Sequence, residues 1–188
     1  MGRHGSGSLA IAVAVVIGLA MSFRLFRPHL GSGDLTTSAD EIPAKAALAR
    51  VASHVDGDTI RLVGQAGSEL LAPGEETRVR LLEVDTPELG RPGAPGECYA
   101  DEASEALREM LPVGAKVHVE ADEELLDPYG RTLLYLWTSR GEFVNLELVR
   151  QGYARAVLYE PNDEHIEQLR RAEAAARADD LGLWGACG

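Results

Sequence analysis

The chain has 188 residues, enough for one domain with a hydrophobic core and short of two comfortable ones. Its composition, 45% hydrophobic and 26% charged, is that of a globular protein. The formal net charge of -12 argues against polyanion binding driven by overall charge, so any nucleic-acid role must depend on a local cationic site.

An uncharged apolar segment, residues 9–23, follows Arg3 and precedes Arg24 and Arg27. As a helix it would measure about 22 Å, whereas a bilayer core needs about 30 Å, so it suits the core of a signal peptide. No clear A-x-A cleavage site follows it. Residues 1–30 are therefore expected to be either a signal peptide or an uncleaved N-terminal membrane anchor, and both place the domain outside the cytoplasm.

Residues 31–44 are polar and rich in Gly, Ser and Thr, which predicts a flexible linker before a folded domain over residues 45–188. The two cysteines, Cys98 and Cys187, fit an export route, where a disulfide is permitted. A bridge between them is the favoured interpretation, and two free thiols are the alternative.

The hydrophobic pattern predicts five strands, separated by turns such as Asp56-Gly57, at residues 47–55, 59–63, 77–84, 115–121 and 131–137. Helical spacing predicts three helices, at residues 99–111, 143–152 and 162–179, the last with Asn162 as N-cap. This order favours an α+β fold, a small closed five-stranded barrel of the OB type covered by helices.

Three carboxylates, Asp58, Asp85 and Glu88, fall near predicted strand ends. Each alone can be explained as a turn or cap residue. If the first hairpin and the third strand are neighbours, Asp58 and Asp85 converge at one end of the barrel. Such hard oxygen ligands suit Ca²⁺ or Mg²⁺ rather than Zn²⁺.

Two arginines join this set, because Arg80 lies inside an apolar strand and Arg131 follows a predicted turn at residues 127–130. A buried arginine needs an anionic partner, either a structural acid or a phosphate. We expect a phosphate, or Glu88 in its absence, to offset Arg80. A carboxylate beside a divalent cation and two arginines is a set of groups able to attack a phosphodiester.

Six segments resemble, in the same order, the staphylococcal nuclease family over roughly residues 46–184. They are VDGDTIRL (55–62), VRLLEVDTPE (79–88), YADEAS (99–104), DPYGRTLLYLW (127–137), VNLELVRQGYARAVLY (144–159) and LGLW (181–184). The resemblance implies an OB-fold barrel with three helices and Ca²⁺-dependent hydrolysis of DNA and RNA that leaves 3′-phosphates.

The resemblance also implies roles for individual residues. It implies Ca²⁺ binding by Asp58, Asp85 and the backbone carbonyl of Thr86, a general base at Glu88, phosphate binding by Arg80 and Arg131, and nucleotide contacts from Tyr129 and Tyr159.

The chain also departs from the family's best-known secreted members, which are basic. The loop after Glu88 carries one cation, Arg91; Pro128 stands where a lysine is common, and Val157 replaces a tyrosine. Weaker polyanion binding is therefore expected. Glu83 is interpreted as surface, and so is the acidic run Glu120, Asp122, Glu123, Glu124 and Asp127.

The leading hypothesis is thus an exported, monomeric, Ca²⁺-dependent nuclease acting on single-stranded DNA or RNA, with membrane attachment if the N-terminal segment is retained. The alternatives are a non-catalytic OB-type module that binds single-stranded nucleic acid or protein, and a phosphodiesterase that prefers small nucleotides.

Overall fold

The computed structural model describes residues 42–187. The predicted signal peptide or anchor at residues 1–30, and the linker as far as residue 41, lie outside this range. Within it, no helix is long and apolar enough to cross a membrane.

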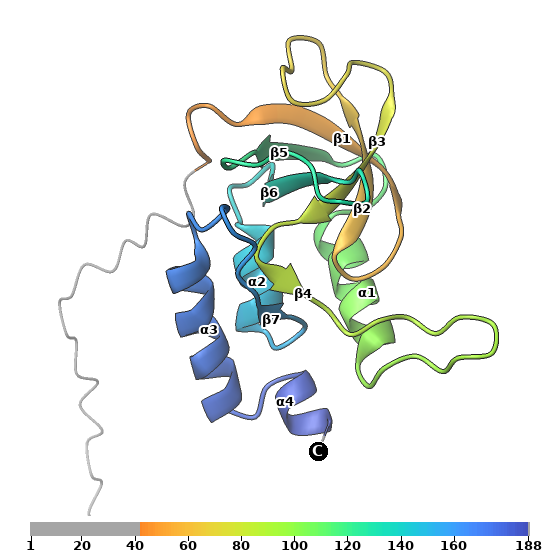
Figure 1. Cartoon of the computed structure of the whole chain (residues 1–188), viewed down its shortest axis with the longest axis vertical. Helices are drawn as coiled ribbons and strands as arrows, with labels where there is room; N and C mark the ends of the chain where they lie inside the picture. Colours follow the sequence, from red (N-terminus) through yellow and green to blue (C-terminus); the bar gives the residue numbers. More distant parts are fainter. Residues whose placement is uncertain (1–41, 188) are drawn as a thin grey trace, which may run out of the picture. The chain divides into compact units, whose positions relative to one another are not determined.

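Five strands close into a barrel in the order β1-β2-β3-β6-β5, as the sequence predicts (Figure 1). They are β1 (Ala47–His54), β2 (Thr59–Gly64), β3 (Glu76–Leu81), β5 (Lys116–Glu120) and β6 (Thr132–Thr138). Strands β1, β2 and β3 form an antiparallel meander, β3 pairs in parallel with β6, and β1 closes the barrel on β5. Alternate residues such as Ile60, Leu62 and Val79 point inward and are fully buried.

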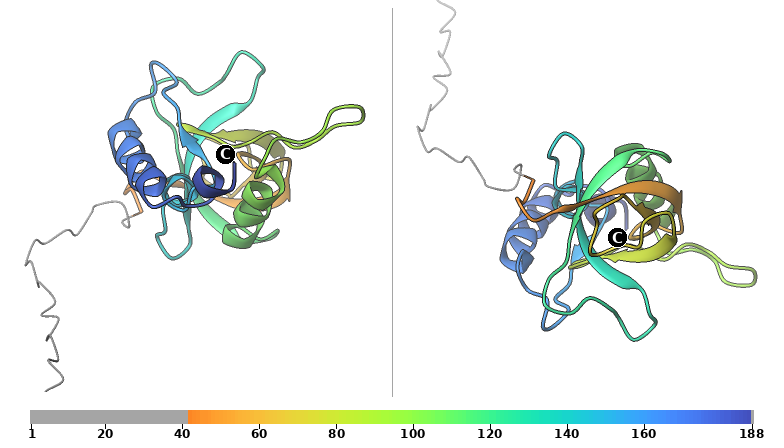
Figure 2. Two further views of the ribbon diagram at one scale, coloured as in Figure 1. Left: turned by 90° about the horizontal axis from the view of Figure 1, so that it is seen from below. Right: turned by 90° about the horizontal axis from the view of Figure 1, so that it is seen from above.

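The predicted helices are present as α1 (Ala100–Met110), α2 (Val144–Arg150) and α3 (Ile166–Ala178), followed by a short α4 (Leu183–Ala186). They gather at one end of the barrel (Figures 1 and 2). A short ladder of β4 (Val84–Asp85) with β7 (Arg155–Ala156) lies beside them. The α+β fold with a closed OB-type barrel is therefore confirmed.

The prediction of a single strand over residues 77–84 is wrong. Strand β3 ends at Leu81, and Glu83 adopts a left-handed conformation (φ 59°) before β4 begins. Buried Asn145 stabilises this break by donating to the carbonyl of Leu82 and accepting from the backbone N–H of Leu136. The chain therefore leaves the barrel wall between β3 and Asp85.

Glu83 is fully buried, so its interpretation as a surface residue is also wrong. Neither carboxylate oxygen of Glu83 has a hydrogen-bond partner within residues 42–187, and the hydroxyl of nearby Tyr135 donates to Asp122 instead. Burial raises the pKa of Glu83 to about 7. The nearby Tyr135 lowers this pKa, but its effect is smaller than the effect of burial.

The predicted N-cap at Asn162 is wrong as well, since α3 begins at Ile166 after His165. The Asn162 side chain is buried and is bonded in both directions to the backbone of Glu124. This amide therefore ties the loop after β5 to the segment before α3, and it is not available to cap the helix.

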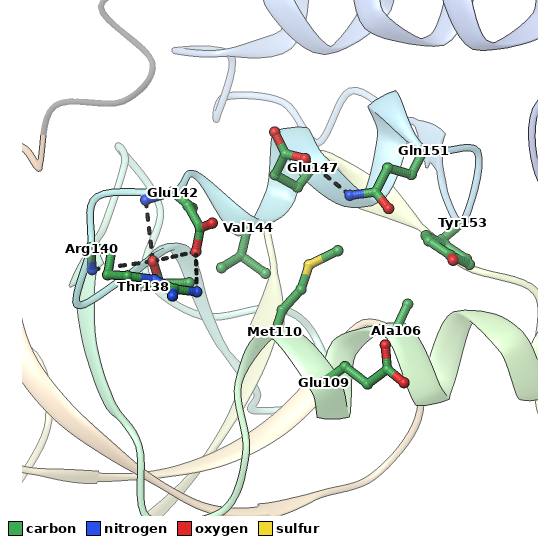
Figure 3. A pocket seen from close by; sticks show the side chains of 10 residues that line it. All are labelled: Ala106, Glu109, Met110, Thr138, Arg140, Glu142, Val144, Glu147, Gln151 and Tyr153. Carbon is green, nitrogen blue, oxygen red and sulfur yellow. Dashed lines mark hydrogen bonds and ion pairs between the residues drawn. The ribbon is translucent and has the colours of Figure 1, made fainter.

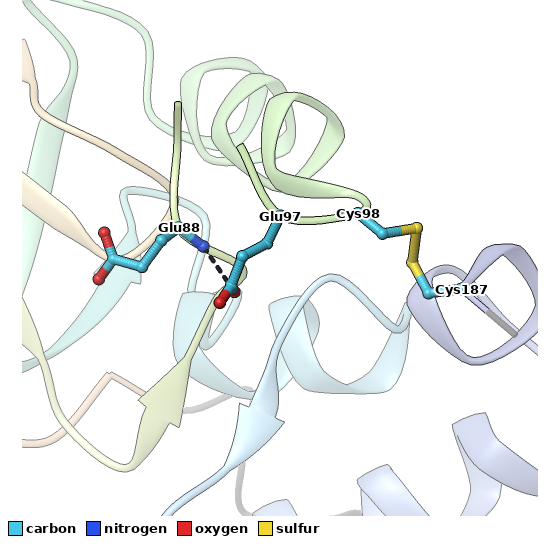
Figure 4. Close-up of a disulfide and its surroundings, with 4 residues drawn as sticks. All are labelled: Glu88, Glu97, Cys98 and Cys187. Atoms are coloured by element: carbon cyan, nitrogen blue, oxygen red, sulfur yellow. Dashed lines mark hydrogen bonds between the residues drawn. A yellow bond between two sulfur atoms is a disulfide. The ribbon is translucent and has the colours of Figure 1, made fainter. Parts of the chain in front are cut away.

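Cys98 and Cys187 form a disulfide in the structure, with 5.9 Å between their Cα atoms (Figure 4). The bridge joins the residue two before α1 to the residue after α4. It therefore links the C-terminal end of the chain to the base of the long loop that precedes α1.

Stability should fall as pH rises, because the carboxyl of Glu83 has a pKa near 4.5 when unfolded and about 7 when folded. The folded state then binds more protons than the unfolded state between these values, and about 3 kcal/mol is lost across the window. Glu83→Gln removes this loss. The free energy of unfolding of the variant relative to wild type should therefore rise by about that amount between pH 5 and pH 8. Glu123→Gln, at an exposed position, is the control, and a pH-independent difference for Glu83→Gln would contradict the assignment.

Replacing both cysteines with serine should lower the free energy of unfolding by about 3 kcal/mol, because the bridge restricts a long loop of the unfolded chain. Denaturant titration of wild type with and without reductant, beside the double variant, measures the effect. Reductant should weaken wild type and leave the variant unchanged. Two free thiols in the mass of the untreated protein would refute the bridge.

Candidate active site

The first hairpin brings Asp58 into contact with Thr86, which lies 28 positions later in the chain. The backbone N–H of Asp58 donates to Asp56 Oδ1 at 3.1 Å, which shapes the turn. Gly57 packs directly on the Thr86 side chain, since a Cβ at Gly57 would lie 2.7 Å from Thr86 Oγ1. Only glycine permits this approach.

Asp58 is held rigidly once it is there. Its Oδ2 accepts the backbone N–H and the hydroxyl of Thr86, both at 3.0 Å, and its Oδ1 accepts the Thr59 hydroxyl at 3.1 Å. The residue is 6% exposed. Thr86 directly follows Asp85, so the predicted convergence of Asp58 and Asp85 is present, and Thr86 fixes the Asp58 carboxylate.

Arg80 is buried between two carboxylates. Its guanidinium lies 3.1 Å from Asp58 Oδ2 and 3.1 Å from Asp85 Oδ1, and it also donates to the carbonyl of Val84 at 2.7 Å. The expectation that Glu88 offsets Arg80 is wrong, because Glu88 lies beyond Pro87 in an exposed loop and its carboxylate pairs with Arg91.

Tyr159 completes the surroundings of Arg80. Pairing of β4 with β7 brings Arg155 opposite Asp85 and so carries the following segment toward the site. The Tyr159 hydroxyl accepts a hydrogen bond from Arg80 Nη2 at 3.0 Å, and the guanidinium carbon lies 5.7 Å from the ring centroid. Burial raises the pKa of Tyr159.

Glu88 stands at the rim of this cluster. Its backbone N–H donates to Glu97 Oε2 at 3.0 Å, and its carbonyl accepts the N–H of Glu97, which closes the base of the loop. The Glu88 side chain points away from Glu97 (Figure 4). Glu88 follows Asp85 by three residues in the chain. The exposed carboxylate faces solvent, where a substrate and a water molecule can reach it.

Arg131 lies in the turn between β5 and β6, where its contacts are with the turn itself. Its Nε pairs with Asp127 Oδ2 at 2.5 Å, and its guanidinium lies over the ring of Tyr129. Within residues 42–187 no hydrogen bond or ion pair joins Arg131 to Asp58, Asp85 or Glu88, so the predicted phosphate-binding role of Arg131 stays a prediction.

Asp127 is a positioning residue that the sequence reasoning missed. Its Oδ1 accepts the backbone N–H groups of Tyr129 at 2.9 Å and Arg131 at 2.8 Å. Burial alone would raise the pKa of Asp127, but these hydrogen bonds and the Arg131 side chain lower it below the ordinary value. Its assignment to a solvated acidic face is wrong, and the turn sequence Asp-Pro-Tyr-Gly was the available signal.

Asp58 and Asp85 are the side chains that could hold a metal ion. Burial raises the pKa of Asp85 by more than the attraction of Arg80 lowers it, and repulsion from Asp58 adds a smaller rise. The cluster therefore carries unmet negative charge. Among residues 42–187 no three His, Cys, Asp or Glu side chains converge as a ready-made site. Further ligands must be backbone carbonyls and water, which suits Ca²⁺ or Mg²⁺.

Two hollows differ in their relation to this cluster. A hollow of about 300 Å³ adjoins Tyr159 and is lined by Leu126, Pro128 and Leu133. Another of about 290 Å³ lies between α1 and α2, away from Arg80, and its polar groups bond to one another, as Glu147 does with Gln151 (Figure 3). Of these two hollows, the first is therefore the one that a ligand bound at Arg80 can reach.

Comparison with known proteins identifies relatives over most of the chain. Residues 78–186 match the family described as Staphylococcal nuclease homologue. The chain is 33% identical to a thermonuclease of Staphylococcus intermedius over 184 residues, covering 98% of this chain and 99% of the relative. It is 32% identical to a thermonuclease of Staphylococcus hyicus, covering 94% and 95%. It is 36% identical to the endonuclease YncB of Bacillus subtilis (strain 168), covering 71% and 60%.

Asp127→Ala should lower the free energy of unfolding by about 2–3 kcal/mol, because three donors in the turn lose their shared acceptor. Glu123→Ala, at an exposed position nearby, should change it by less than about 0.5 kcal/mol. Urea denaturation of both variants measures the difference. Equal effects would mean that the carboxylate of Asp127 does not hold the turn.

Proposed function

This chain belongs to the staphylococcal nuclease family, and we propose that it is an exported, Ca²⁺-dependent nuclease that hydrolyses phosphodiester bonds of DNA or RNA. The observation that carries this proposal is the buried Arg80 guanidinium between Asp58 and Asp85, with Glu88 at the exposed rim. Names of the relatives, thermonuclease and endonuclease, agree with it.

Asp58, Asp85 and the backbone carbonyl of Thr86 would hold the cation. When bound, Ca²⁺ would neutralise charge on the phosphate and so favour attack on phosphorus. Thr86 contributes a second role, because its N–H and hydroxyl already hold Asp58 in one orientation. Such preorganisation spares the site from reorganising when substrate arrives.

The two arginines would bind the non-bridging oxygens of the scissile phosphate. Arg80 is fixed by its protein acceptors, whereas the side chain of Arg131 is 22% exposed and reaches solvent beside Tyr129. Guanidinium groups match the geometry of phosphate oxygens, and fixed positive charge stabilises the charge that grows there in the transition state.

Glu88 would accept a proton from the attacking water. The water oxygen would form a bond to phosphorus as the bond from phosphorus to the 5′-oxygen breaks, and the 5′-oxygen would leave with the electron pair and take a proton from solvent water, while Glu88 would return its proton to solvent. The products are a 3′-phosphate and a 5′-hydroxyl. An exposed carboxylate beside the phosphate site is suited to this role because water reaches it directly.

The substrate is proposed to be single-stranded. Tyr159 and the apolar hollow beside it suit a nucleoside, and the ring of Tyr129 is 85% exposed and available for stacking. Bases can reach such surfaces only when they are unpaired. The chain is proposed to act as a monomer.

Two features of the chain support the proposal that it is exported. Residues 9–23 form an apolar segment typical of a signal peptide or membrane anchor, and the disulfide suits an oxidising compartment outside the cytoplasm.

Cleavage of single-stranded DNA by residues 37–188 should require Ca²⁺ and stop in EDTA. Glu88→Gln should lower kcat by about 10²–10⁴-fold through loss of the base, and Arg131→Ala by at least about 10²-fold through loss of transition-state charge stabilisation. Initial rates with a fluorescent oligonucleotide measure both, and mapping of product ends should find 3′-phosphates.

Arg170→Ala on α3 is the matched control, since it removes an exposed arginine far along the chain from the site. Equal rates for wild type, Glu88→Gln and Arg131→Ala, or equal rates with Ca²⁺ and EDTA, would sink the mechanism. Binding without turnover under any metal would favour the non-catalytic module instead.

A further inference from the structure

Two arginines face each other on the outside of the barrel. Arg61 of β2 and Arg78 of β3 are directly opposite partners in the antiparallel ladder, and both side chains are exposed. Thr59 and Arg80 are the pair two positions along the same ladder. The arginine pair therefore lies beside the strand segment that carries the buried guanidinium of the site.

Neither member of this pair has an anionic partner within residues 42–187. The chain holds 30 acidic residues against 18 basic ones, and exposed arginines elsewhere, such as Arg108, Arg170 and Arg177, pair with neighbouring glutamates. Like charges directly opposite each other in a sheet are unfavourable. An unpaired cationic pair in so acidic a chain indicates an anion that comes from outside the protein.

Glu76 is the acid nearest along β3, two residues before Arg78 on the same face. It lies opposite Val63 rather than Arg61, and it makes no ion pair with Arg78. The two arginines are thus left free to bind a ligand although a carboxylate is near.

A hollow connects Arg78, one member of the pair, to Glu88 at the catalytic rim. It measures about 420 Å³, and Arg78, Arg91, Glu88 and Asp56 are among the residues that line it. The apolar hollow at Tyr159 shares no residue with it. Tyr159 bonds to Arg80, Arg80 pairs with Asp58, and the backbone of Asp58 bonds to Asp56, so the catalytic cluster lies between the two hollows.

We propose that Arg61 and Arg78 bind backbone phosphates of the polynucleotide strand adjacent to the scissile phosphate, on the side away from Tyr159. The strand then runs from the Tyr159 hollow across Arg80, past Glu88 and along the outer face of β3 and β2. This inference rests on the proposed nuclease function and extends it to longer substrates.

The proposed phosphate site at Arg61 and Arg78 explains how an acidic chain can bind a polyanion. Phosphate binding depends on cations that touch the backbone, and each contact made with a single strand contributes about 0.7 to the slope of log affinity against log salt. Two contacts at Arg61 and Arg78 supply a local attraction that the net charge of -12 does not.

The test compares Arg61→Gln/Arg78→Gln with Arg170→Gln/Arg171→Gln, a control that removes the same charge from the exposed face of α3. Affinity for a single-stranded DNA of about 12 nucleotides is measured by fluorescence anisotropy in EDTA, between about 25 and 200 mM NaCl. The β-strand variant should bind at least about tenfold more weakly at low salt, with a salt slope less steep by about 1.4. The control should stay within about twofold of wild type.

Cleavage with Ca²⁺ supplies the second arm. For the β-strand variant, KM on the oligonucleotide should rise by about tenfold, whereas KM on a dinucleotide, whose single phosphate reaches Arg80, should rise by less than about threefold. Equal losses for both double variants, or equal losses on both substrates, overturn the proposal. If wild type cleaves neither substrate, the nuclease function fails, and the anisotropy arm still decides whether the arginine pair binds the strand.

Discussion

The buried guanidinium of Arg80 is the constraint on which the site depends. A charge in that position is tolerated only if anions and carbonyls surround it, because leaving it unpaired costs several kcal/mol. Its acceptors come from separate segments: Asp58 from the first hairpin, Val84 and Asp85 from β4, and Tyr159 from beyond β7. Each of these segments must fold against β3 for Arg80 to be satisfied, so the stability of the fold and the assembly of the site are the same requirement.

The same arrangement explains how charge is distributed. Around Arg80 the carboxylates outnumber the arginines that contact them, and the pKa of Asp85 is raised because burial and the neighbouring Asp58 disfavour a further charge. A bound cation would offset this excess of negative charge around Arg80. On the outer face of β2 and β3 the balance is reversed, since Arg61 and Arg78 lack acidic partners within the described residues. Net charge is therefore a poor guide to what this surface attracts, because recognition occurs over a few ångströms.

Much of the fold could be read from the sequence, and the failures share a cause. Alternating apolar residues predict the five strands, and the Asp56-Gly57 dipeptide predicts the first hairpin. The sequence around Glu83 predicts a surface residue, because a glutamate at the end of an apolar strand normally faces water, whereas here a left-handed turn points it inward. Asn162 resembled a helix cap but bonds to the backbone of Glu124. Asp127 resembled a solvated acid but holds the Arg131 turn. In each case the deciding partner was supplied by tertiary packing rather than by local pattern.

The sequence by itself determined the types and order of the elements and which residues are chemically able to act, because propensity, periodicity and turn chemistry are local properties of the chain. Only the tertiary structure decided that Arg80 pairs with Asp58 and Asp85 rather than Glu88, that Glu83 is buried, and that Arg78 shares a hollow with Glu88. Those outcomes depend on barrel closure, where the parallel pairing of β3 with β6 and the β4–β7 ladder join segments about 50 to 70 residues apart. No local window of sequence carries that information, since the register of such distant pairs is set by the packing of the whole core.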